Sequence, residues 1–177
     1  MPSDRTRLLR GALAGAAAAA VWEAQSPLDS RVFGVEYSDA MLLGSAVTRG
    51  RGAFGIGLAM HMANGALFGA AYSRVAPSLP GPGVARGVAA GLGEHAATWP
   101  LMRFAKLHPA ASRLPKLWGS PAALAQATWR HALFGALLGG LEGRLNPREV
   151  RPAPAEDPPG SSNGHGSFER VTVLGTA

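Results

Sequence analysis

The stretch from Gly57 to Gly69 reads GLAMHMANGALFG and sets one histidine in a row of glycines spaced four residues apart. A four-residue step keeps residues on one slowly drifting face of an α-helix, so this face predicts a bare groove beside one imidazole. Two later apolar segments repeat the pattern around His95 and His131. The three rows are Gly57, His61, Gly65 and Gly69, then Gly83, Gly87, Gly91 and His95, and finally His131, Gly135, Gly139 and Gly143.

Rows of this kind favour a helical membrane protein, because helices in lipid pack closely along glycine faces and turn polar groups toward one another. Charge placement agrees with this interpretation. Charged residues make up 16% of the 177-residue chain, below the roughly 25% that is usual in soluble domains. Between Gly52 and Met102 the only charged residues are Arg74, Arg86 and Glu94. We therefore expect an all-α integral membrane protein surrounded by lipid.

Composition also argues against several functional classes. The chain has no cysteine, which excludes disulfides, iron–sulfur clusters and thiol catalysis. Its net charge of +6 is carried mostly by arginines at the ends of apolar segments, so we expect a membrane flank and no nucleic-acid binding. We find no nucleophile motif, phosphate loop or dinucleotide fingerprint. The sequence thus predicts no enzymatic activity.

We expect a bundle of four transmembrane helices within residues 1–146. Gly52 to Ser73 is the strongest of them, with 22 uncharged residues between two arginines. Residues 24–51 are expected to form a loop, with a short interfacial helix near residues 38–47. The four helices are predicted over residues 8–23, 52–73, 83–104 and 121–143.

The two ends of the chain differ in character. A basic start and a short alanine-rich run predict a retained helix over residues 8–23, with a cleaved signal peptide as the alternative. Residues 147–177 are rich in Pro, Gly and Ser, which predicts a disordered tail. We expect location in a bacterial cytoplasmic membrane with a cytoplasmic N-terminus, since the first helix usually sets orientation.

The candidate site is a polar cluster at the centre of the bundle. The three histidines fall near the midpoints of their segments, and hence at one depth in the membrane. Glu94 and Arg130 lie at a similar level on consecutive helices and could pair, which would reduce the cost of placing each in lipid. The cluster consists of His61, Asn64, Glu94, His95, Arg130 and His131.

This cluster permits several functions. It could lock the bundle as a structural hydrogen-bond network, or pass protons or ions, because imidazole titrates near neutral pH. No cofactor is required, but two imidazoles from facing helices could hold a haem iron, and three with a carboxylate could hold a transition metal. The glycine rows could instead pack against a second copy or a partner helix, as in an assembly subunit.

Part of the chain resembles a known family. The run from His61 to Tyr72, the motif of His95 followed by Pro100-Leu101-Met102, and His131 in the last helix resemble the second half of YagU-like bacterial inner-membrane proteins. The resemblance implies a multi-pass membrane protein and no particular activity. This chain departs from it by carrying Glu94 and Arg130 beside the histidines, where the family pattern implies neutral residues.

Overall fold

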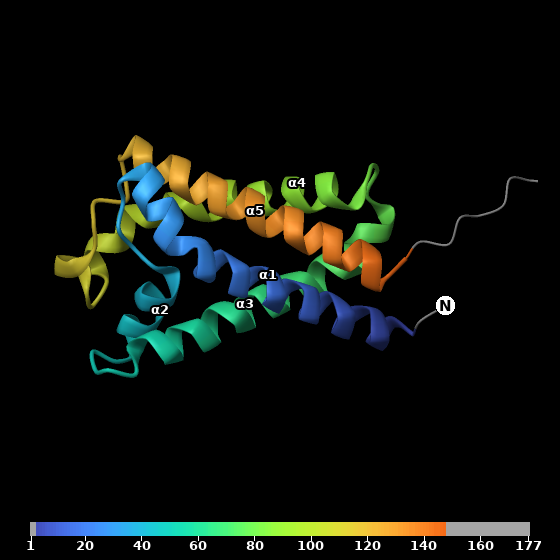
Figure 1. Cartoon of the computed structure of the whole chain (residues 1–177), viewed down its shortest axis with the longest axis horizontal. Helices are drawn as coiled ribbons and strands as arrows, with labels where there is room; N and C mark the ends of the chain where they lie inside the picture. The colour runs from blue at the N-terminus through green and yellow to red at the C-terminus, as the bar shows by residue number, and fades with distance from the viewer. Residues whose placement is uncertain (1–2, 148–177) are drawn as a thin grey trace, which may run out of the picture.

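The computed structural model describes residues 3–147, and every regular element within them is helical (Figure 1). Residues 148–177, which include most of the predicted disordered tail, lie outside the described residues. The α-helices are α1 (Asp4–Phe33), α2 (Asp39–Val47), α3 (Ala53–Val75), α4 (Gly83–Thr98) and α5 (Pro121–Leu145). Three short 3₁₀ helices join them, namely η1 (Ala76–Ser78), η2 (Trp99–Leu107) and η3 (Ala111–Arg113).

Helix α1 is much longer than the sequence predicts. The Ser3 hydroxyl caps its start by accepting from the Thr6 N–H, and it ends only at Gly34, whose φ of 68° is the left-handed conformation that glycine adopts readily. The prediction of a loop from residue 24 onward was therefore wrong for residues 24–33. Proline commonly breaks a helix, but α1 continues through Pro27. Side chains beyond Pro27 bond to α5, which holds this last stretch helical.

Helix α4 is shorter than predicted. The expected helix over residues 83–104 changes to 3₁₀ geometry at Trp99, directly before Pro100. Proline lacks the N–H that would donate the next hydrogen bond of an α-helix. The short helix predicted near residues 38–47 is present as α2, where the Ser38 hydroxyl accepts from the Met41 N–H.

The four long helices run antiparallel to their neighbours, in the spatial order α3, α1, α5, α4 (Figure 1). Contacts between α1 and α5 fix their antiparallel register, because the Arg10 guanidinium at the start of α1 donates to the Leu145 carbonyl at the end of α5 (2.8 Å). Helix α2 packs against the first half of α3. The bundle is thus two helix pairs, α1 with α3 and α4 with α5, joined through α1 and α5.

Glycine grooves form both helix pairs. A methyl group built on Gly87 of α4 would collide with the backbone of Gly135 and Gly139 in α5. Likewise Gly65 and Gly69 of α3 meet the backbone of α1, and Gly57 meets α2. The predicted glycine rows therefore pack against other helices of the same chain. Their partners include three glycines that the sequence analysis did not single out, Gly11, Gly15 and Gly44.

Gly143 is the exception among the predicted packing glycines. Among the described residues a methyl group on it would meet nothing within 4 Å, so Gly143 packs against no other helix of residues 3–147. The row that begins at His131 leaves the contact face after Gly139, because a four-residue step drifts around a helix that turns once in about 3.6 residues.

The interior and exterior of the bundle differ from those of a soluble domain. The interior consists largely of small residues, such as Ala14 and Ala18, and of charged residues such as Arg130. Large apolar side chains point outward, and Val32 and Leu67 are 78% and 71% exposed. One stretch of the described chain, Ala53–Ser78, is long and apolar enough to cross a membrane.

Candidate functional site

Arg130 of α5 forms the centre of a buried ion-pair network. It is fully buried, and its guanidinium donates to Asp29 twice, from Nε at 2.6 Å and from Nη2 at 2.7 Å. Nη1 donates to Asp39 at 2.8 Å, and Nη2 also donates to the Ser26 hydroxyl and the Tyr37 carbonyl. The expected pairing of Arg130 with Glu94 was therefore wrong. Two acidic residues from α1 and α2 hold this arginine instead.

Further polar groups complete the Arg130 network. Gln126 donates to Asp29 at 2.8 Å, and the Trp22 indole donates to Asp39 at 2.9 Å. Glu23 accepts from the Ser38 hydroxyl at 2.5 Å and from the Ala40 N–H at 3.2 Å. Every nitrogen of the guanidinium has an acceptor, whereas the buried Gln126 Oε1 has no partner within residues 3–147.

Two groups of this network have displaced pKa values. Burial alone would raise the pKa of Asp29, but hydrogen bonds from Arg130, Gln126 and Gln25 outweigh it and lower that pKa below its usual value. Burial raises the pKa of Tyr37, whose ring lies 4.4 Å from the Arg130 guanidinium carbon. Asp29 is therefore held as a carboxylate and Tyr37 as a neutral phenol.

The acidic half of this network escaped the sequence analysis. Glu23, Ser26 and Asp29 are spaced three residues apart, which places them on one helical face. A three-residue spacing indicates a polar face only where the segment is helical. Because the sequence analysis predicts a loop over residues 24–51, it does not identify this face.

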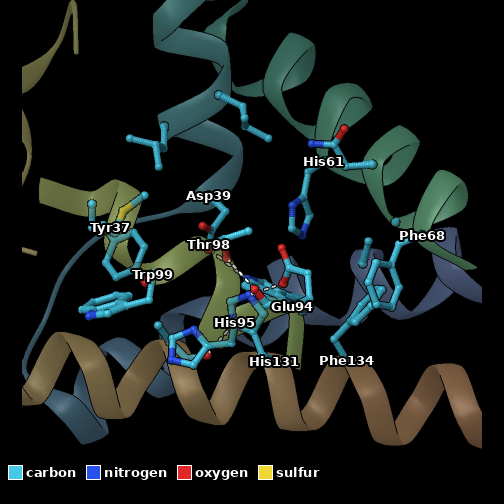
Figure 2. Close-up of a pocket in the computed structure, with 18 residues that line it drawn as sticks. Tyr37, Asp39, His61, Phe68, Glu94, His95, Thr98, Trp99, His131 and Phe134 are labelled. Carbon is cyan, nitrogen blue, oxygen red and sulfur yellow. Dashed lines mark hydrogen bonds and ion pairs between the residues drawn. The ribbon is translucent and has the colours of Figure 1, made fainter. Parts of the chain in front are cut away.

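The other predicted cluster residues line a cavity of about 470 Å³, which Trp22, Tyr37 and Asp39 of the Arg130 network also border (Figure 2). The cavity lies at the end of the bundle that carries α2 and η2, and α1, α3, α4 and α5 also contribute to its wall. Aromatic rings make up much of that wall, among them Trp22, Phe68, Trp99 and Phe134. The predicted cluster residues that line it are His61, Asn64, Glu94, His95 and His131.

Glu94 and His131 share one proton inside this cavity. His131 Nδ1 lies 2.7 Å from the Ala127 carbonyl, which can only accept, so Nδ1 carries a proton. His131 Nε2 lies 2.8 Å from Glu94 Oε2. If Glu94 is ionised, His131 is an imidazolium, and if His131 is neutral, Glu94 holds the proton. In both cases one proton lies between Nε2 and Oε2.

His95 is held in a defined tautomer next to this pair. The single hydroxyl proton of Thr128 goes to the Leu124 carbonyl at 2.8 Å, so its oxygen accepts from His95 Nε2 at 3.0 Å. Neutral His95 then has a bare lone pair on Nδ1, which is buried and has no partner within residues 3–147. The His95 and His131 rings lie 4.6 Å apart between centroids. A proton acceptor thus sits beside the shared proton.

His61 faces the same cavity from α3 and points toward Glu94 (Figure 2). Its ring meets the edge of Trp22 at 5.3 Å, and Trp22 in turn meets His131 at 4.6 Å. His61 Nε2 is buried and unpartnered among the described side chains. Asn64 lies one turn further along α3, on the cavity wall.

The arrangement does not favour a transition-metal site. Within the described part of the chain, no group of three His, Asp or Glu side chains is placed to hold a metal ion. Both nitrogens of His131 are already engaged, so among these three histidines the buried nitrogens without a partner in the described chain are His61 Nε2 and His95 Nδ1. His108 lies outside this cavity, where it accepts from the Ala110 N–H and bonds to the Leu42 carbonyl at 3.1 Å, so it tethers α2.

Comparison of the chain with protein-family models, with curated proteins and with solved structures finds no match.

Proposed function

We propose that this chain is a multi-pass protein of a bacterial cytoplasmic membrane, and that its cavity binds and passes protons. Support for the membrane comes from the reversal of polarity between interior and exterior. Charged and small residues lie inside, while large apolar side chains along the long helices face outward. Water would make that distribution costly, whereas lipid favours it. The resemblance to YagU-like inner-membrane proteins points the same way.

The polar cluster divides into two parts with different roles in this proposal. Arg130 is fully buried and each of its guanidinium nitrogens has an acceptor, so its network locks α1, α2 and α5 together. The Glu94, His95 and His131 group lines an open cavity and keeps one acceptor unpaired. Only the second group is suited to exchange protons, because a proton can be taken up there without breaking an existing bond.

The single observation that carries the proposal is the shared proton between His131 and Glu94, next to the bare Nδ1 of His95. Imidazole and carboxylate groups in this arrangement act as donor and acceptor near neutral pH. Phe68 and Phe134 line the cavity with ring centroids 5.6 Å apart, and in this proposal they form its barrier toward the other end of the bundle. Passage across the membrane would require these two rings to separate.

Proton flux in reconstituted vesicles tests this function. Vesicles loaded with a pH-sensitive dye should dissipate an imposed pH gradient faster than empty vesicles, and Glu94→Gln or His131→Ala should remove the difference. Arg144→Gln, on the exposed surface of α5, is the matched control and should leave flux unchanged. Wild-type vesicles no leakier than protein-free ones would rule the function out.

Haem binding is the second candidate, favoured by the two unpaired nitrogens of His61 and His95, which come from different walls of the cavity. Those two side chains would be the axial ligands. The visible absorption spectrum of haem-supplied protein, oxidised and then reduced, tests this directly. An intense band that shifts on reduction and disappears in His61→Ala would favour haem over proton passage.

A further inference from the structure

A second cavity, of about 210 Å³, lies at the opposite end of the bundle. It is formed where α1 and α4 begin and α5 ends, next to η1. The proposed proton site uses none of its residues. The side chains and backbone that line it include Arg7, Ala76, Gly83, Arg86, Glu142 and Asn146.

Arg86 is a buried cation without a counterion in the described chain. Its residue is only 8% exposed, and Nη1 donates to the Ala76 carbonyl. Within residues 3–147 its Nε has no acceptor, and no carboxylate lies within 4.0 Å of its guanidinium. A buried arginine in this state carries a large desolvation cost, so an anionic group is needed close by.

Glu142 is the matching buried anion in the same cavity. It is 2% exposed and accepts one long hydrogen bond from Asn146 Nδ2 at 3.3 Å. Asn146 Nδ2 also donates to the Arg7 carbonyl, which settles the orientation of the amide and leaves Oδ1 buried without a donor. The cavity therefore contains three groups that lack full partners among the described residues. They are the Arg86 guanidinium without a counterion, Asn146 Oδ1 without a donor, and the Glu142 carboxylate with one long hydrogen bond.

We propose that this second cavity binds a zwitterionic headgroup of the phosphoethanolamine type. The phosphate would accept from Arg86 and Arg7, and the ammonium would donate to Glu142 and Asn146 Oδ1. A simple anion would be repelled by Glu142 and a simple cation by Arg86, whereas a ligand with both charges satisfies both residues. The proposal rests on the proposed membrane placement, which sets this end of the bundle at the level of the lipid headgroups.

Native mass spectrometry of the full chain in detergent tests the site. Short-chain phosphatidylethanolamine should bind about tenfold more tightly than phosphatidylglycerol, the loss expected when one charge-assisted hydrogen bond is missing. Glu142→Gln should remove this preference by weakening only the zwitterion. Arg86→Gln should weaken both lipids about tenfold, and exposed Arg144→Gln should change neither.

Two further measurements keep the result unambiguous. The double variant Arg86→Gln with Glu142→Gln removes both buried charges together, so it should remain folded and lose the zwitterion. Free phosphoethanolamine that competes with the lipid would assign recognition to the headgroup, and failure to compete would assign it to the intact lipid. Equal binding of both lipids by wild type and all variants would overturn the proposal and leave water as the occupant.

Flotation with liposomes tests membrane placement separately.

Discussion

Arg130 of α5 holds Asp29 of α1 through two parallel hydrogen bonds of 2.6 and 2.7 Å, although 101 residues separate them in the chain. A guanidinium and a carboxylate joined in this way form a fork with fixed direction, stronger than a single neutral hydrogen bond. The pair joins the last turns of α1 to the first half of α5. It also keeps Arg130 out of the cavity, and so leaves Glu94 free to pair with His131.

Replacing Arg130 by Gln should lower the free energy of unfolding by about 3–5 kcal/mol. The substitution leaves buried Asp29 and half-buried Asp39 without their cation, which costs more than the pair itself contributes. Chemical unfolding in mild detergent measures the change. Arg144→Gln removes an exposed arginine from the same helix and should cost at most about 1 kcal/mol. Similar losses in the two variants would contradict the structural lock.

Low pH should reduce the stability of the folded protein, because it protonates Asp29. Burial favours the neutral form, but its hydrogen bonds from Arg130, Gln126 and Gln25 place the folded pKa below the ordinary value of 3.8. The unfolded chain therefore binds the proton more readily, and the stabilisation is complete above pH 3.8 and is lost as pH falls through the folded pKa. Melting temperatures from pH 7 down to 3 measure this. Asp29→Asn should have a lower melting temperature than wild type at pH 7, and its melting temperature should fall less on acidification. An equal fall in both proteins would exclude Asp29 as the cause.

Two glycines of α4 should respond oppositely to one methyl group. Gly87→Ala should destabilise the protein by about 1–3 kcal/mol, because the methyl meets the backbone of Gly135 and Gly139, which cannot move aside without parting the helices. Gly93→Ala meets nothing within 4 Å and should stabilise by up to about 1 kcal/mol through helix propensity. Thermal unfolding of the two variants compares them. A stabilising Gly87→Ala would mean that α4 and α5 are not in groove contact.

The ring of His95 should carry its proton on Nε2 at neutral pH, because Thr128 can only accept from it. Nitrogen-15 NMR of histidine-labelled protein distinguishes the two tautomers. Thr128→Val, which keeps the shape and removes the acceptor, should yield a mixture of both. A proton found on Nδ1 in the wild type would refute the arrangement and remove the free acceptor from the proposed proton site.

Removing the ring of Phe68 should raise proton flux several-fold, if the pair with Phe134 is the barrier at the end of the cavity. The dye-loaded vesicles used for the wild type measure the flux of Phe68→Ala. Leu67→Ala truncates the neighbouring, outward-facing side chain and serves as the control, for which we expect no change. Flux that stays at the wild-type level in Phe68→Ala would place the barrier elsewhere.

The amino-acid sequence by itself determined the helical character of the chain and the faces on which its helices meet. Glycine spacing is a local property of one helix, so the rows from Gly57 to Gly69 and from Gly83 to Gly91 predicted packing surfaces that the structure contains. The sequence could not determine which helix each glycine row contacts. Gly143 was included among the packing glycines only because its spacing matched.

Only the tertiary structure decided the partners of the charged residues. Depth along a helix suggested that Glu94 and Arg130 were neighbours, yet pairing also depends on rotation about each helix axis and on which elements lie adjacent. Arg130 faces α1 and α2, whereas Glu94 faces His131 across the groove between α4 and α5. The continuation of α1 through Pro27 was equally a tertiary outcome, because the bonds that hold Asp29 come from a helix about one hundred residues further along the chain.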